Sequence, residues 1–384
     1  MNRVSVQPEM LRWARERAGL DAAHLASRFP KLAEWESGDL NPTMKQLDAF
    51  AHATYTSFGL LLLPQPPEEQ VPIPDFRTIA GRAVRRPSAN LLDTIYICQE
   101  RQDWYVEFAD DERRTRLPFV GSLSPQTPIP EAAATMRQAL EFDLDDRRDC
   151  PTWTEALRRF VEQVDKSGIL VMVTGVVQNN NHRKLDVEEF RGFALADQVA
   201  PLIFINGADS KSAQMFTLAH ELAHIWLGAS ALSNASPTSS DGNAIEVWCN
   251  AVAAEFLMPL ALVRAEANTN ASLASEVQRL AKRFKVSTLV VLRRLHDAGQ
   301  LTRAQFIAAY QDEVDNLADI LERKKSGGGD FYATTATRVS RRFASALVES
   351  TLEGRTLYRD AFRLLGIAKT ETLHQLGRSL QFNI

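Results

Sequence analysis

Residues 216–224 read FTLAHELAH, and the two histidines in this stretch decide how the rest of the chain is interpreted. His220 and His224 are four residues apart, so on a helix they lie one turn above each other and can direct both imidazoles at one cation. Glu221 then lies beside that cation, where its carboxylate can take a proton from water. A tetrahedral zinc site with three protein ligands keeps its fourth position for such a water. The stretch therefore predicts Zn²⁺ ligands at His220 and His224, with Glu221 as the general base of amide hydrolysis. The alternative is an amphipathic helix on which two surface histidines form the pattern by chance.

The third ligand has to come from another segment of the chain. The letters IWLG that follow His224 exclude the extension that supplies a third histidine in one class of zinc peptidases. A second predicted helix, residues 244–257, offers Glu246 and Glu255. We select Glu246 because it lies at the start of this helix, opposite the first one, and we assign Glu255 to a solvated face. The alternative for Glu246 is an acid that the helix dipole favours at an N-terminus. Asn250, one turn later, is a candidate to orient one histidine through its free ring nitrogen.

A small sheet is expected before the histidine-bearing helix. Short apolar or alternating runs at 168–173, 189–194 and 201–206 predict three strands. The helix begins near Ser212, a loop rich in Ser, Ala and Asn follows at 229–243, and Pro259 stops the second helix. This order predicts a compact α+β unit. We expect the strand at 189–194 to be its edge, aligning an extended protein substrate by strand addition.

The residues around both helices resemble a known family. Besides FTLAHELAH, residues 246–259 read EVWCNAVAAEFLMP, and over about residues 167–325 the chain resembles the ImmA/IrrE family of metallo-endopeptidases. The resemblance implies a zincin-like core of the gluzincin type, with zinc ligands at His220, His224 and Glu246 and a catalytic glutamate at Glu221. Many members carry a second acid where this chain has Trp248. The resemblance also implies a substrate class, namely regulatory proteins, typically helix-turn-helix repressors, that are cut to release transcription.

Residues 9–63 resemble a degenerate helix-turn-helix domain of the XRE type, with landmarks in LRWARERAGL from Leu11 and WESG from Trp35. Only eight residues separate Ala26 from Trp35, and Pro30 is among them, so about one turn of the recognition helix is missing. Residues 1–64 carry seven Lys/Arg and seven Asp/Glu, so no excess of positive charge favours phosphate contact. The module is therefore predicted to contact protein or to dimerise, and DNA binding is the alternative.

A second pattern of helix, tight turn and helix covers residues 280–295. Residues 277–305 carry seven Lys/Arg and one Asp, a net charge of +6. This charge is compatible with phosphate contacts to DNA or with a packed helical hairpin that has solvated basic faces. We favour the packed hairpin.

The length of 384 residues favours more than one domain. The predicted order is a degenerate helix-turn-helix module at 1–64, a connector and helical bridge at 65–150, the metallopeptidase core at 151–270, a basic helical region at 271–325, and a glycine hinge with a helical tail at 326–384. The core is thus flanked by mainly helical N- and C-terminal domains.

The composition limits the class of protein. A net charge of −4 argues against a chain that coats nucleic acid or anionic membrane along its whole surface. No apolar run approaches the roughly 20 residues of a membrane span, and the N-terminus lacks the apolar segment of a secretory signal. We therefore expect a cytoplasmic protein with no membrane partner, in which Cys98, Cys150 and Cys249 are reduced.

These patterns together predict a cytoplasmic zinc endopeptidase that hydrolyses a peptide bond in a regulatory protein, such as a helix-turn-helix repressor or an antitoxin-like partner. The alternative is a DNA-binding transcriptional regulator or antitoxin that keeps a peptidase fold as a sensor or scaffold.

Overall fold

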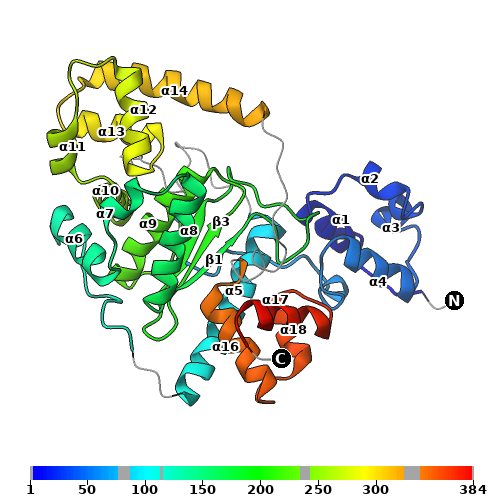
Figure 1. Cartoon of the computed structure of the whole chain (residues 1–384). Helices are drawn as coiled ribbons and strands as arrows, with labels where there is room; N and C mark the ends of the chain where they lie inside the picture. The colour runs from blue at the N-terminus through cyan, green and yellow to red at the C-terminus, as the bar shows by residue number, and fades with distance from the viewer. Residues whose placement is uncertain (1–2, 77–86, 113–115, 234–242, 324–337, 383–384) are drawn as a thin grey trace. The chain divides into compact units, whose positions relative to one another are not determined.

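A computed structural model of the chain describes residues 3–76, 87–112, 116–233, 243–323 and 338–382 (Figure 1). The chain forms two compact units, one of Met1–Pro72 with Val84–Tyr96 and the other of Ile73–Ala83 with Ile97–Ile384. The predicted glycine hinge at 324–330 lies outside the described residues. The finer division into five parts stays a prediction.

The first unit is helical, as predicted. It contains α1 (Pro8–Arg17), α2 (Ala22–Ala26), α3 (Leu32–Ser37), α4 (Met44–Ala53) and a short 3₁₀ helix, η1 (Leu60–Leu62). A capping box formed by Thr43 and Gln46 begins α4, because each side chain satisfies a backbone N–H that the first helical turn leaves free. The aromatic rings of Phe29, Trp35 and Phe50 meet in the core of this unit, mostly edge to face. Whether the unit is a helix-turn-helix domain stays a prediction.

A four-stranded sheet forms the centre of the second unit. Its strands are β1 (Leu170–Thr174), β2 (Gly192–Leu195), β3 (Leu202–Asn206) and β4 (Ala231–Ser233), in the order β1-β3-β2-β4. β1 is parallel to β3, whereas β2 is antiparallel to both β3 and β4. The three predicted strands are confirmed. β4 lies in the segment predicted to be a loop, because three residues are too few to show an alternating pattern.

β2 is not an edge strand, so the expectation for residues 189–194 is wrong. It pairs with β3 through Gly192↔Ile205 to Leu195↔Leu202, and with β4 through Gly192↔Ser233 to Ala194↔Ala231. The outer edge on this side of the sheet therefore belongs to β4. Any extended segment that adds to the sheet here has to pair with β4.

Helices cover both faces of the sheet (Figure 1). One face packs against α8 (Trp153–Lys166) and α9 (Lys211–Leu227), through Val171, Ala194, Ile203 and Ile205. The other face meets α5 (Ala89–Asp111) and α16 (Arg341–Leu352). On α5, Gln102 donates hydrogen bonds to the carbonyl groups of Leu195 and Ala200, at 3.0 and 2.7 Å. The result is an α+β architecture, as predicted.

The remaining helices surround this core. α10 (Ala244–Leu257) packs against α9 and against α6 (Ile129–Ala139). The others are α7 (Leu144–Arg148), α11 (Leu260–Glu266), α12 (Leu273–Phe284), α13 (Thr288–Asp297), α14 (Arg303–Arg323), α17 (Tyr358–Leu365) and α18 (Thr370–Ser379). These helices lie in the segments expected to form a helical bridge, a basic helical region and a helical tail, and the division into these parts stays a prediction.

Within the described ranges, no single helix combines the length and apolar composition that a membrane crossing requires. The bent pair α10 and α11 satisfies the two criteria together, but most of α10 is buried in the core. Cys98, Cys150 and Cys249 are free and buried.

Candidate metal centre

The helix α9 carries the two histidines through the middle of the core. The Ser210 hydroxyl accepts a hydrogen bond from the Ala213 N–H and starts the helix, and Gly228 ends it in the left-handed conformation with φ 68°. Nearly every side chain between these caps is buried, so α9 is a core helix rather than an amphipathic surface helix. His220 and His224 are completely buried, with ring centroids 4.9 Å apart. The chance pattern of two surface histidines is thereby excluded.

The first turn of α10 brings the predicted third ligand to the same point. Asn243 caps this helix, and Glu246 lies in its first turn. Its Oε2 is 3.2 Å from His220 Nε2 and its Oε1 is 2.9 Å from His224 Nε2, while the two Nε2 atoms are 3.2 Å apart. Zinc–ligand bonds of about 2.0–2.1 Å in a tetrahedron separate the ligand atoms by about 3.3 Å. The two Nε2 atoms and the Glu246 carboxylate thus lie as close together as the ligands of one metal ion.

The charges of the ligands suit a divalent metal. Burial by itself opposes ionisation of Glu246, but hydrogen bonds with both histidines lower the pKa of its carboxyl group to about 2. Burial lowers the pKa of His224, whereas the hydrogen bond that it donates to the Glu246 carboxylate raises this pKa. The site therefore holds an ionised carboxylate and, at His224, a neutral imidazole, the protonation states that bind metal.

Neither histidine is oriented through its second ring nitrogen. His220 Nδ1 and His224 Nδ1 have no hydrogen-bond partner among the described residues. The proposed hydrogen bond from Asn250 is therefore not formed, although Asn250 is buried on α10. Packing and the contacts at Nε2 orient the two rings instead.

Glu221 lies beside the ligands and is completely buried. Burial raises the pKa of its carboxyl group well above the ordinary value, the negative charge of Glu246 raises it further, and the nearby Ser233 hydroxyl group acts in the opposite direction. A carboxyl group with a raised pKa can both accept and donate a proton near neutral pH. The environment of Glu221 therefore suits a general base that later acts as an acid.

Ser233 belongs to the centre but was not identified from the sequence. Its Oγ is 3.4 Å from His224 Nε2 and 3.5 Å from Glu246 Oε1, and its side chain is buried. The pairing of β4 with β2, in which Ser233 is opposite Gly192, places it there. No spacing in the Ser-rich segment distinguishes this serine, so only the strand pairing reveals it.

The expectation that Glu255 lies on a solvated face is wrong. Glu255 is buried, accepts hydrogen bonds from the Leu260 N–H and pairs with Arg294. Pro259 ends α10 and leaves the first N–H groups of α11 in need of an acceptor, which the Glu255 carboxylate supplies. Glu255 therefore has a structural role away from the metal ligands.

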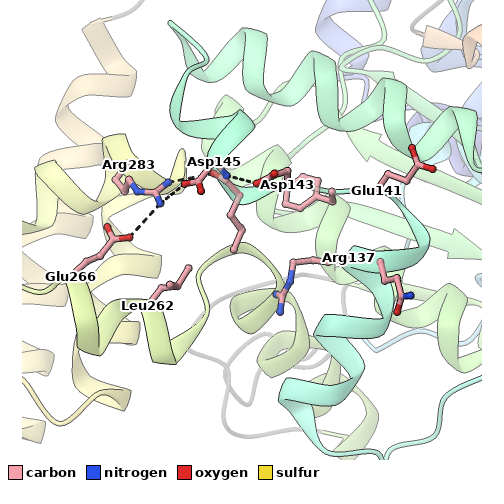
Figure 2. A pocket seen from close by; sticks show the side chains of 10 residues that line it. Arg137, Glu141, Asp143, Asp145, Leu262, Glu266 and Arg283 are labelled. Carbon is pink, nitrogen blue, oxygen red and sulfur yellow. Dashed lines mark hydrogen bonds and ion pairs between the residues drawn. The ribbon is translucent and has the colours of Figure 1, made fainter.

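A surface hollow of about 700 Å³ lies elsewhere, among α6, α7, α11 and α12 (Figure 2). Its cations already have partners: Arg283 pairs with Asp145 at 2.8 Å and with Glu266 at 3.3 Å, and Arg137 donates to the backbone carbonyl groups of Glu255 and Phe256. None of the five residues of the metal centre, Ser233 included, lines it. The hollow is not the functional site.

Two segments of the second unit match known families. Residues 339–379, which include α16 and α17, match a domain of unknown function (DUF8813). No curated protein matches the chain. Residues 164–296 match the IrrE N-terminal-like domain. Because this match contains the whole sheet, α9, α10 and all five residues of the centre, it supports membership of the ImmA/IrrE family and a metallopeptidase-type function for this part of the chain.

Proposed function

We propose that this chain is a zinc-dependent endopeptidase that hydrolyses a peptide bond in a regulatory protein, such as a helix-turn-helix repressor or an antitoxin-like partner. One observation carries the proposal. His220, His224 and Glu246 converge on one point, with the carboxyl group of Glu221 beside them at a raised pKa. The match to the IrrE N-terminal-like domain supports it independently.

The donor set favours zinc over other common divalent metals. Two imidazoles and one carboxylate at tetrahedral spacing are typical of catalytic Zn²⁺ sites, whereas Mg²⁺ and Ca²⁺ take six or more oxygen ligands. Zinc held by these residues would polarise the scissile carbonyl group and acidify a water molecule. Glu246 remains ionised and offsets part of the positive charge.

Glu221 performs the proton transfers in the proposed mechanism. Its carboxylate accepts a proton from the attacking water, and the resulting carboxylic acid donates that proton to the nitrogen of the departing amine. The same side chain therefore serves both half-reactions.

The proposed substrate class rests on the family resemblance and on the order of the predicted helical modules around the metallopeptidase core. The experiment is to incubate the zinc-loaded protein with a helix-turn-helix repressor encoded next to it and to follow cleavage by mass spectrometry. Glu221→Gln should keep zinc and abolish cleavage. The matched control is Glu131→Gln, at an exposed glutamate on α6. Cleavage by Glu221→Gln at the wild-type rate would refute the mechanism.

The alternative function, a DNA-binding regulator with a scaffold-like peptidase domain, finds less support in the charges of residues 277–305. Arg279, Arg283, Arg293 and Arg294 all form ion pairs with acidic side chains. Lys285 is buried, with its ammonium group over the Trp153 ring. These contacts favour the packed hairpin over a phosphate-binding surface. Gel-shift binding that survives Glu221→Gln, without cleavage of any repressor, would favour the alternative.

A further inference from the structure

The outer edge of β4 is occupied by the chain itself. The Leu232 N–H donates to the Pro74 carbonyl oxygen at 2.9 Å, and the Phe76 N–H donates to the Leu232 carbonyl oxygen at 3.0 Å. These bonds join residues 74–76 to β4 in parallel, with Asp75 opposite Leu232. Ile73, just before, is buried and anchors the segment. Residues 74–76 thus form a short added strand, here called the edge segment.

The edge segment also reaches the metal ligands. The ring of Phe76 stacks on the imidazole of His224, with centroids 6.4 Å apart and an interplanar angle of 19°. Phe76 is half-buried, while His220, Glu221 and His224 are 0% exposed. A polypeptide substrate cannot reach the two histidines while they are completely covered. Phe76 is part of that cover.

The same edge is the one that an extended substrate would need. β4 carries Ser233, whose hydroxyl group is 3.4 Å from His224 Nε2, so a peptide paired with β4 runs beside the ligands. Such a peptide would bind the N–H and C=O of Leu232, because main-chain hydrogen bonds hold an added strand. Pro74 and Phe76 already use both groups. The edge segment and a substrate strand therefore exclude each other.

We propose that the edge segment is an intrinsic inhibitory strand that occupies the substrate-binding edge and covers the metal centre until it is displaced; the proposal rests on the proposed peptidase function. An extended segment with a large apolar side chain at the position of Phe76 is the partner that fits this edge. The edge segment begins two residues after Pro72, where the first stretch of the N-terminal unit ends. The chain itself therefore connects a ligand bound to that unit with the edge segment.

The test compares two phenylalanines that stack on the same helix. Phe76→Ala removes the ring over His224. Phe119→Ala removes another half-buried ring, which stacks on Trp226 of α9 with centroids 4.5 Å apart and does not touch the ligands. The probe is the chelator 4-(2-pyridylazo)resorcinol, whose colour reports the rate of zinc extraction from the full-length protein. Phe76→Ala should lose zinc about tenfold faster. Loss of one aromatic pair shifts the equilibrium between the covered and the uncovered metal centre by about this factor. Phe119→Ala should match the wild type, and Phe76→Leu should be intermediate.

A peptide with the sequence of residues 71–78 supplies the second measurement. Added to Phe76→Ala, it should slow zinc extraction again, whereas the same peptide with alanine in place of its phenylalanine should not. If Phe76→Ala and Phe119→Ala accelerate extraction equally, or neither does, the inhibitory strand is refuted.

Measuring cleavage of the repressor distinguishes failure of the inhibitory-strand proposal from failure of the proposed peptidase function. A higher kcat/KM for Phe76→Ala, with none for the double variant Phe76→Ala/Glu221→Gln, supports both proposals. Faster zinc extraction from Phe76→Ala without any cleavage of the repressor supports the covering role of Phe76 and refutes the proposed peptidase function.

Discussion

Gly192 faces Glu221 where β2 packs against α9: a methyl group at Gly192 would lie 3.2 Å from Glu221 Oε1, 2.6 Å from the Thr217 methyl group and 2.9 Å from the Phe204 carbonyl oxygen. Real side chains do not tolerate the two shorter contacts, so only glycine permits this approach of helix and strand. The close approach fixes the position of the general base relative to the sheet.

Gly192→Ala should therefore move α9 away from β2 and displace Glu221. We expect a loss of about 1–3 kcal/mol in the free energy of unfolding, as for other overpacked cores. The measurements are urea unfolding, zinc content and kcat/KM for the repressor. Gly59→Ala is the control, since a methyl group there meets only the Ser57 hydroxyl at 4.0 Å. Wild-type stability and activity of Gly192→Ala would contradict the packing argument.

The three ligands can be tested by the zinc content of variants. Loss of one ligand from a three-ligand site should lower zinc affinity by more than the roughly 10–100-fold that loss of a supporting hydrogen bond costs. We expect His220→Ala and Glu246→Gln to be purified without stoichiometric zinc, as measured by elemental analysis, and Glu255→Gln to retain it. A fully loaded Glu246→Gln variant would transfer the role of third ligand to another group.

The grouping of His220, His224 and Glu246 could be predicted from the sequence because its geometry is mostly local. The four-residue spacing of His220 and His224 fixes their relation on any helix, and Glu246 lies in the first turn of the next predicted helix along the chain. Ser233 and Phe76 could not be found in this way. Both reach the centre through strand pairing between short segments, and such pairing leaves no periodic signal in three residues.

The interpretation of Glu255 failed for a related reason. An acid near the end of a helix is usually exposed, and nothing in α10 alone indicates that Arg294 and the start of α11 need a buried partner. The same tertiary pairing explains why the net charge of +6 over residues 277–305 overstates the free positive charge of that region.

Zinc release on acidification should follow His224 and not Glu246. Glu246 stays ionised until the pH approaches its pKa of about 2. Burial lowers the pKa of His224 below its ordinary value of 6.5, so protons displace the metal only at pH values below 6.5, and zinc content falls as the pH falls. The measurement is bound zinc after equilibrium dialysis between pH 7.5 and 4.5. Zinc loss that begins above pH 7 would contradict this assignment.

The ion pair between Glu255 and Arg294 is expected to stabilise the fold without affecting the chemistry. Arg294 also donates to the Met258 carbonyl oxygen at 2.9 Å, so the pair joins α13 to the end of α10. Glu255→Leu leaves the buried guanidinium group with only Asp297, at 3.4 Å, as its counter-charge, and we expect a cost approaching the roughly 3–5 kcal/mol of a broken buried pair. The double variant Glu255→Leu/Arg294→Leu should lose less than the sum of the two single variants, because it leaves no unpaired buried charge.

The control for this pair is its neighbour on α13. Arg293 forms a partly exposed ion pair with Asp297 at 2.9 Å, and Arg293→Ala should cost less than about 1 kcal/mol. Urea unfolding gives the four free energies of the double-mutant cycle, and elemental analysis should find zinc in every variant, since Glu246 lies at the opposite end of α10. If Glu255→Leu lowers the free energy of unfolding by no more than Arg293→Ala does, burial of the Glu255–Arg294 pair does not control the stability of this unit.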